Sequence, residues 1–218
     1  LSYKQALYKH NIEWTMLELR IPRVVGRSHK AMDQFFSALY SVRNEATDMF
    51  EKYRDGEVTL WFSLEVISFG GEVHFYIRAP TKHKGVVTAN LYANYPMLEV
   101  EEVEDYALSF PASMSDLRAN GFDIFGSELK LGKPDAYPIR TYLQFEDPLD
   151  DTRNLDPIAA LLEVLSQIKK RENVCVQILV RPAAPSWREK GEKVVKELKE
   201  KGGKKIVNEL GESRDEKP

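Results

Sequence analysis

The stretch LWFSLEVISFGGEVHFYIRAP, residues 60–80, decides the fold because it predicts two paired strands joined by a tight turn. Gly70 and Gly71 suit a two-residue hairpin turn, which needs backbone conformations with positive φ. Counting outward from this turn places Val66 opposite Phe75, so that apolar side chains share one face of the hairpin. The other face then carries a mixture of aromatic, charged and small side chains: Trp61, Ser63, Glu65, Ile67, Phe69, Glu72, His74, Tyr76 and Arg78.

The segments on either side of the hairpin complete one antiparallel sheet with two helices. Alternating apolar residues predict strands at residues 14–21 and 98–106, and helical spacing predicts helices that start after Ser28 and at Gly85. The order strand, helix, strand, strand, helix, strand folds through right-handed crossovers into a ferredoxin-like sandwich. We therefore predict an α+β fold class, with a ferredoxin-like unit over residues 12–108.

The second half of the chain predicts a second, incomplete or permuted ferredoxin-like unit over residues 121–201, packed on the first. Its clearest helix has Asp156 as N-cap, Pro157 as the first helical residue, and an apolar stripe that we expect to be buried. Residues 202–218 are rich in Lys and Glu, which predicts a charged, disordered tail. The other elements expected in this unit are strands at 125–131, 139–145 and 173–182 and a charged helix from Ser186 onward.

The composition is that of a globular protein with no strong preference for a charged partner. The chain has 218 residues, of which 43% are hydrophobic, and a formal net charge of -3. Such a charge gives no general attraction to nucleic acid or to anionic lipid. Cys175 is the one cysteine, so the chain forms no disulfide within itself, which fits a reducing compartment.

The localisation that follows from these features is cytoplasmic. No apolar run approaches the roughly 18 residues of a membrane helix, and no signal-peptide pattern opens the chain. The first residue is Leu1, so the sequence leaves room for an upstream helix that would attach the protein to the inner membrane. Any contact with the membrane would depend on that further segment.

The motifs of common enzyme sites are missing from the sequence. A nucleotide-binding loop needs the G-x-x-x-x-G-K-[ST] spacing, and neither residues 191–198 nor residues 202–205 have it. The four histidines are scattered, and Cys175 has no nearby ligand partner, so no zinc cluster is predicted. No nucleophile lies beside a base. We therefore predict a protein that is not an enzyme, with no catalytic, cofactor-binding or metal-binding residues and no cofactor.

The polar face of the hairpin is the candidate interaction surface. An aromatic sheet face is how RNA-recognition modules stack bases, which makes single-stranded nucleic acid a possible partner. The acidic residues on this face would repel phosphates, and no basic stripe surrounds it. In the other interpretation, the second half of the chain covers this face and buries its aromatic rings. The candidate interaction residues are Trp61, Glu65, Phe69, His74, Tyr76 and Arg78.

Several phrases resemble one family found in, or encoded beside, bacterial conjugation and type IV secretion ATPases of the TraG/HerA–FtsK-like kind. The resemblance runs from Trp14 to Leu198 in consistent order. The phrases are WTMLELRIP, SHKAMDQFFSAL, WFSLEVISFGGEVHFYIR, ANLYANYP, EVEDYA, LKLGKPDAYPIRTY, LDPIAALLEVLS and VQILVRPA.

This resemblance implies an N-terminal or accessory domain that accompanies a DNA-pumping motor. It implies a docking or assembly role in a conjugation or type IV secretion machine, in which an exposed sheet edge or helix face binds a protein. The partner would be the secretion or conjugation ATPase or a second copy of the chain. A single-stranded nucleic acid binder and a purely structural domain are the alternatives. The resemblance transfers no catalytic residues.

Overall fold

The computed structural model describes most of the chain and divides it into two compact units. The first unit comprises Leu1–Ile124 and Phe145–Pro182, and the second comprises Phe125–Gln144 and Ala183–Pro218. The described residues are 2–22, 30–43, 54–133, 137, 158–184 and 186–210.

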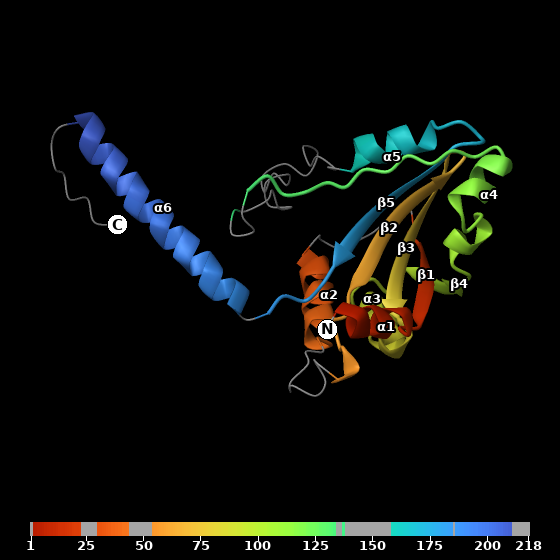
Figure 1. Ribbon diagram of the computed structural model, residues 1–218, viewed down its shortest axis with the longest axis horizontal. Coiled ribbons are helices and arrows are strands. Elements are labelled where there is room, and N and C mark those ends of the chain that lie inside the picture. Colours follow the sequence, from red (N-terminus) through yellow and green to blue (C-terminus); the bar gives the residue numbers. More distant parts are fainter. Residues whose placement is uncertain are drawn as a thin grey trace. The chain divides into compact units, whose positions relative to one another are not determined.

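The first unit is a mixed α and β structure built on one open antiparallel sheet (Figure 1). The strands lie in the order β4-β1-β3-β2-β5, so that β4 and β5 form the two edges. This confirms the predicted antiparallel sheet and adds to it a fifth strand, which comes from the second half of the sequence. The strands are β1 (Trp14–Arg20), β2 (Phe62–Phe69), β3 (Glu72–Pro80), β4 (Glu99–Val103) and β5 (Asn173–Val180).

The central hairpin has the register that the sequence predicts. Gly70 and Gly71 both have positive φ, at 59° and 104°, and they join β2 to β3. Val66 lies opposite Phe75, as the count outward from the two glycines requires. Because side chains alternate between faces, this register also assigns every residue of both strands to one side of the sheet.

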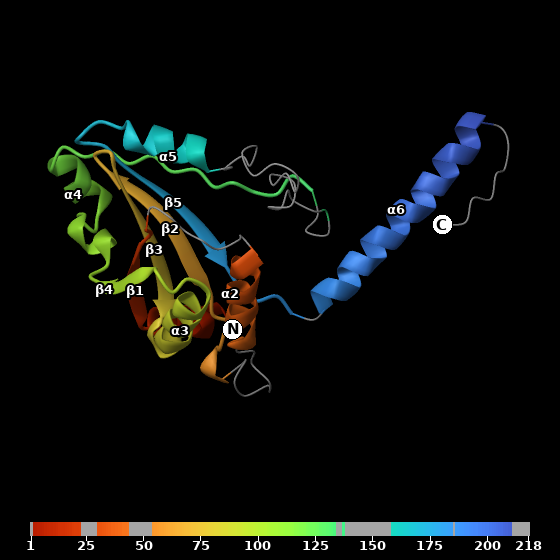
Figure 2. The ribbon, with the colours of Figure 1, turned by 180° about the vertical axis from the view of Figure 1, so that it is seen from behind.

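Two helices of the first unit, α2 and α3, form the main core with the sheet. The α-helices of the described residues are α1 (Ser2–His10), α2 (Lys30–Ser41), α3 (Lys84–Asn94), α4 (Met114–Ala119), α5 (Ala159–Ser166) and α6 (Ser186–Leu210). Short 3-10 helices follow β3 (η2, Thr81–His83) and β4 (η3, Tyr106–Ser109). Figure 2 shows α2 and α3 next to each other. Their buried side chains meet one sheet face in a core of Leu17, Phe35, Leu39, Phe62, Ile77, Ala79, Val87, Leu91 and Leu98.

A polar anchor holds α5 against the hairpin end of the sheet. The Ser68 hydroxyl donates a hydrogen bond to the Leu165 carbonyl oxygen at 2.6 Å, and both residues are buried. The apolar stripe predicted for this helix is only partly buried, because Ile158 and Leu161 are exposed. Only the inward side of a single short helix meets the sheet, so the rest of its apolar stripe faces outward. The predicted cap, Asp156 and Pro157, lies outside the described residues.

Two further expectations for the second half change. The strand predicted at residues 125–131 is wrong, because these residues have no strand structure and their side chains are exposed. Gly121 and Gly132 lie on either side of them, and they have no strand partner among the described residues. No ladder of hydrogen bonds therefore offsets the conformational entropy that a strand would lose on ordering. The strand predicted at 139–145 lies outside the described residues. Helix α6 continues to Leu210, so it includes residues 202–210 of the segment predicted as a disordered tail.

We expect Gly71→Ala to destabilise the protein. A Cβ atom at residue 71 would lie 2.8 Å from the Ser166 carbonyl oxygen, and the positive φ there disfavours any other residue. We expect a loss of about 1–3 kcal/mol in the free energy of unfolding, measured by urea titration with circular dichroism.

Gly85→Ala is the matched control for that variant. Gly85 lies in α3, and nothing lies within 4 Å of the Cβ atom that alanine would add. Alanine is the better helix former by about 0.5–1 kcal/mol, so this variant should be as stable as the wild type or more so. If both variants have the same stability, the turn does not constrain the fold as described.

Candidate functional site

The face of the sheet opposite α2 and α3 brings together the candidate interaction residues. We call it the Tyr106 face, because the Tyr106 side chain of η3 packs on it. Its buried apolar residues are Met16, Ile67 and Tyr76, with Phe69, Val103 and Tyr106 packed against them.

A buried carboxylate lies at the centre of the Tyr106 face. Glu65 is 2% exposed, and the Tyr106 hydroxyl donates a hydrogen bond to its Oε2 atom at 2.5 Å. Gln177 Nε2 donates to the Tyr106 hydroxyl oxygen at 3.3 Å, and Cys175 Sγ lies 3.4 Å from that oxygen. Glu65 Oε1 has no hydrogen-bond partner among the described residues. Burial raises the pKa of Tyr106 far above its ordinary value, with contributions from Cys175 and Glu65, so the phenol stays protonated.

The aromatic rings of this face pack on one another. The Tyr106 ring lies 5.6 Å from the ring of Tyr76 and 6.0 Å from that of Phe69. On its other side Tyr76 stacks on His74, with a centroid distance of 6.0 Å and an interplanar angle of 15°. Tyr76 is 8% exposed, and burial together with the charge of Glu18 raises its pKa. A nucleic acid base would find little of this ring to stack on.

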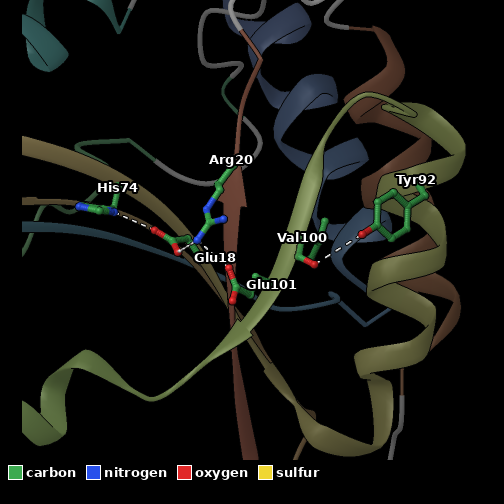
Figure 3. Close-up of polar contacts among 6 residues, drawn as sticks. All are labelled: Glu18, Arg20, His74, Tyr92, Val100 and Glu101. Atoms are coloured by element: carbon green, nitrogen blue, oxygen red, sulfur yellow. Dashed lines mark hydrogen bonds and ion pairs between the residues drawn. The ribbon is translucent and has the colours of Figure 1, made fainter.

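A row of polar contacts links β3, β1 and β4 across the Tyr106 face (Figure 3). His74 Nδ1 of β3 lies 2.8 Å from Glu18 Oε1 of β1. Glu18 is directly opposite Glu101 of β4, and Arg20 lies close to both carboxylates, at 3.7 Å and 2.6 Å. Because Arg20 offsets the repulsion between the two glutamates, this row stabilises the pairing of β1 with β4. Exposed ion pairs of this kind contribute about 0–1 kcal/mol each.

Arg78 holds the start of η3 on the face. Its Nη2 atom lies 3.2 Å from Asp105 Oδ2, and its guanidinium lies over the ring of Trp14 at 5.3 Å. Asp105 also caps η3, since its Oδ1 atom accepts a hydrogen bond from the Ala107 N–H group at 2.9 Å. Trp61 packs against Trp14 with ring centroids 4.9 Å apart.

All six candidate interaction residues therefore lie on one face, but that face is largely occupied from within the chain. Glu65 and Tyr76 are buried, and the other four are half-buried. Among the described residues, the cover comes from Asp105 and Tyr106, directly after β4, whereas the expectation was a cover from the second half of the chain. The second half of the sequence contributes Cys175 and Gln177 through β5.

The chain also has a groove of about 660 Å³ beside α1. It is lined by α1, by residues 54–60 and by the end of β3, with Lys4 and Lys82 among its charged residues. Arg54 is a third cation and Glu13 and Asp55 are the acidic residues, and the hydrogen bond from Arg54 lowers the pKa of Asp55. The mixed charge of the groove selects no ligand class.

The described residues give no sign of a metal site or a membrane span. They contain no group of three or more His, Cys, Asp or Glu side chains that could hold a metal ion. Among the described helices, none combines the length and the apolar composition that crossing a membrane requires.

The two edges of the sheet differ sharply in charge. Strand β4 reads EVEEV and presents Glu99, Glu101 and Glu102. Strand β5 reads NVCVQILV, eight residues without a charged side chain. Within the described residues, only β2 pairs with β5, so its outer backbone groups form a free edge. Natural sheets usually protect a free edge with charges, as β4 does, and β5 lacks this protection.

Apolar side chains flank the free edge on both faces of the sheet. Val174 and Ile178 point to the face of α2 and α3 and are 37% and 57% exposed. Leu179 points to the Tyr106 face and is 67% exposed. The sequence of β5 was predicted as a strand, but its place at the edge of the described sheet was not.

Residues 2–217 match the sequence profile of a family described as Domain of unknown function (DUF8128). No curated protein and no solved structure matches the chain.

We expect Tyr106→Phe to cost about 1–3 kcal/mol in the free energy of unfolding, because it leaves the buried Glu65 carboxylate without its donor. Tyr92→Phe is the matched control, since the Tyr92 hydroxyl is exposed and lies 3.5 Å from the Val100 carbonyl oxygen (Figure 3). Urea titrations of both variants check this, and equal effects would contradict a special role for the Glu65 contact. Glu65→Leu combined with Tyr106→Phe should recover part of the loss.

We also expect the Cys175 thiol to react slowly with iodoacetamide. Burial raises its pKa above the ordinary value of 9.0, the Tyr106 hydrogen bond opposes this shift and the negative charge of Glu65 adds to it. Because the thiolate is the nucleophile, the alkylation rate of the folded protein should still be rising with pH at pH 9. At pH 8 this rate should be lower than the alkylation rate of the urea-unfolded chain. Glu65→Gln should raise the folded rate and leave the unfolded rate unchanged. A folded rate that levels off below pH 9 would contradict the raised pKa.

Proposed function

The chain belongs to the DUF8128 family, and we propose that it is a non-enzymatic assembly module that binds a protein by strand addition at β5. In strand addition, an extended segment pairs with the free backbone groups of an edge strand, and the side chains of alternate residues give specificity. The observation that carries the proposal is the uncharged, eight-residue free edge of β5 with its exposed apolar flanks.

The contrast with β4 supports this choice of surface. A strand that approached β4 would meet the row of glutamates and the ion pairs of Arg20 and Lys84 with them. At β5, the approaching strand would meet only apolar and amide side chains. Pairing there would satisfy the outer backbone groups and remove Val174, Ile178 and Leu179 from water, which stabilises a complex.

The Tyr106 face supports a structural role better than a docking role. Its central polar groups, Glu65 and Tyr106, bond to each other, and its rings contact neighbouring rings. We therefore assign Trp61, Phe69, His74 and Arg78 to holding η3 and the strands together. Base stacking on this face stays a prediction, which a salt series with labelled oligonucleotides would test.

The wider context of the module is also part of the proposal. The order β4-β1-β3-β2, with α2 and α3 as the crossovers, supports a ferredoxin-like unit extended by β5. A place in a conjugation or type IV secretion machine, with a motor ATPase or a second copy as partner, depends on the sequence resemblance. The module would then act in the cytoplasm beside that machine.

Binding of an extended peptide tests the proposal directly. A peptide of alternating valine and threonine, flanked by lysines for solubility, would be titrated into isotope-labelled protein and followed by two-dimensional amide NMR. We expect saturable shifts in the amides of residues 173–180. Ile178→Lys should weaken binding about fivefold, which corresponds to roughly 1 kcal/mol of cross-strand contact.

Two controls keep the result interpretable. Val164→Lys replaces another exposed β-branched residue, on α5 and away from the edge, and should leave binding unchanged. A peptide with proline at its centre should bind more weakly, because proline cannot donate to the ladder. Shifts centred on the Tyr106 face, or no shifts at millimolar peptide in a chain that light scattering shows to be monomeric, would reject β5 as the docking edge.

A further inference from the structure

We propose that the strand which adds to β5 is the β5 strand of a second copy, so that two chains form a closed dimer with a continuous sheet. This inference rests on the proposed function and names its partner. An antiparallel pair of identical strands has a two-fold axis, so both copies use the same surface patch. If residue i of one copy contacts residue j of the other, then residue j of the first copy also contacts residue i of the second. An edge suited to this must be compatible with its own sequence in reverse.

The alternation of side chains restricts how β5 can pair with itself. Residues that lie opposite each other in an antiparallel pair point to the same face, so the two-fold axis must pass midway between the two copies of one residue. The axis then lies at Val176, Gln177 or Ile178, the central residues of the strand. Each choice shifts the pairing by two residues, and charges at the strand ends distinguish them.

Gln177 is the central residue that suits the sequence best. With the axis there, Val174 pairs with Val180, Val176 with Ile178, and Gln177 with itself across the axis. Such β-branched pairs stabilise sheets, and two glutamine amides can donate to and accept from each other.

The neighbouring registers are less favourable. With the axis at Val176, Arg171 would lie opposite Arg181, which is a repulsive pair, and Glu172 would lie opposite Val180. With the axis at Ile178, Cys175 would lie opposite Arg181. The Gln177 register places Arg181 opposite Asn173 instead, where its charge meets a neutral amide.

The opposite edge explains why pairing would end at a dimer. Continued growth would need β5 of one chain to pair with β4 of the next, in a head-to-tail contact that does not close. This contact would place the carboxylates of β4 beside the exposed apolar side chains of β5. The carboxylates would lose water molecules that hydrate them, which is unfavourable. Pairing of β4 with β4 would set glutamate against glutamate. Only the β5–β5 contact is free of charge conflict.

Cross-linking through single cysteines tests this register. In the Cys175→Ser background, Gln177→Cys should form an intermolecular disulfide under mild oxidation. Residues directly opposite in an antiparallel pair have Cα atoms about 4.5–5.5 Å apart, which a disulfide can bridge. Covalent dimer is measured on non-reducing gels, and we expect at least a tenfold excess over the control described next.

Leu179→Cys is the matched control, since Leu179 is more exposed than its neighbours but would lie opposite residue 175 of the other copy. In the Cys175→Ser background its two copies are about 13 Å apart, four residues along a strand, so it should not cross-link. With the native Cys175 retained, Leu179→Cys should cross-link through that residue. This pair of outcomes is particular to the Gln177 register.

The mass of the full chain in solution completes the test. Light scattering after gel filtration should give twice the chain mass for the wild type and for Val164→Lys, and the single mass for Ile178→Lys. Circular dichroism shows whether the lysine variant keeps its fold, and the cross-linking series stands without it.

A chain that stays monomeric but binds the valine–threonine peptide at β5 would overturn the dimer and leave the docking function standing. A dimer that persists in Ile178→Lys and does not cross-link at residue 177 would overturn the inference. If, in addition, the valine–threonine peptide caused no amide shifts in residues 173–180, the docking function would be rejected as well.

Discussion

The two-glycine turn at Gly70-Gly71 is the constraint on which the rest of the sheet depends. It fixes how β2 pairs with β3, and β1 and β5 then pair with the outer sides of these two strands. A shift of one residue in the register would exchange the faces of β2. Glu65 would then point into the core under α2 and α3, and Phe62 would leave it. The Tyr106 face and the β5 edge both follow from this one turn.

Local periodicity made most of the first unit predictable from the sequence. The hairpin, β1, α2, α3 and β4 each have a pattern that can be recognised within about ten residues. Helix α4 was missed although a signal was present, since Ser113 followed by Asp116 is a helix-start spacing and Ser113 caps the helix. The role of Tyr106 had no such signal, because Glu65 and Gln177 are 41 and 71 residues away along the chain.

The candidate site shows what a pattern of alternation can and cannot indicate. The sequence placed Trp61, Glu65 and Tyr76 on one face correctly, because side-chain parity depends only on the turn. It did not indicate which segment covers that face. For β5, the run of uncharged residues 173–180 is equally typical of a strand buried in the middle of a sheet. Its position at an edge depends on pairing with β2, which lies far away in the sequence.

That distance has a kinetic consequence for the polypeptide as it is synthesised. The β2–β5 ladder closes a loop on the order of a hundred residues, whereas the hairpin closes almost none, so the ladder forms late. Until β5 arrives, the nascent sheet ends at β2, whose backbone is bare at the moment when misfolded chains associate most readily. An ionisable group in the middle of that temporary boundary discourages intruding strands. Glu65, which accepts a hydrogen bond from the Tyr106 hydroxyl of η3 in the folded protein, therefore lies at the exposed edge of the unfinished sheet before it becomes part of the interior.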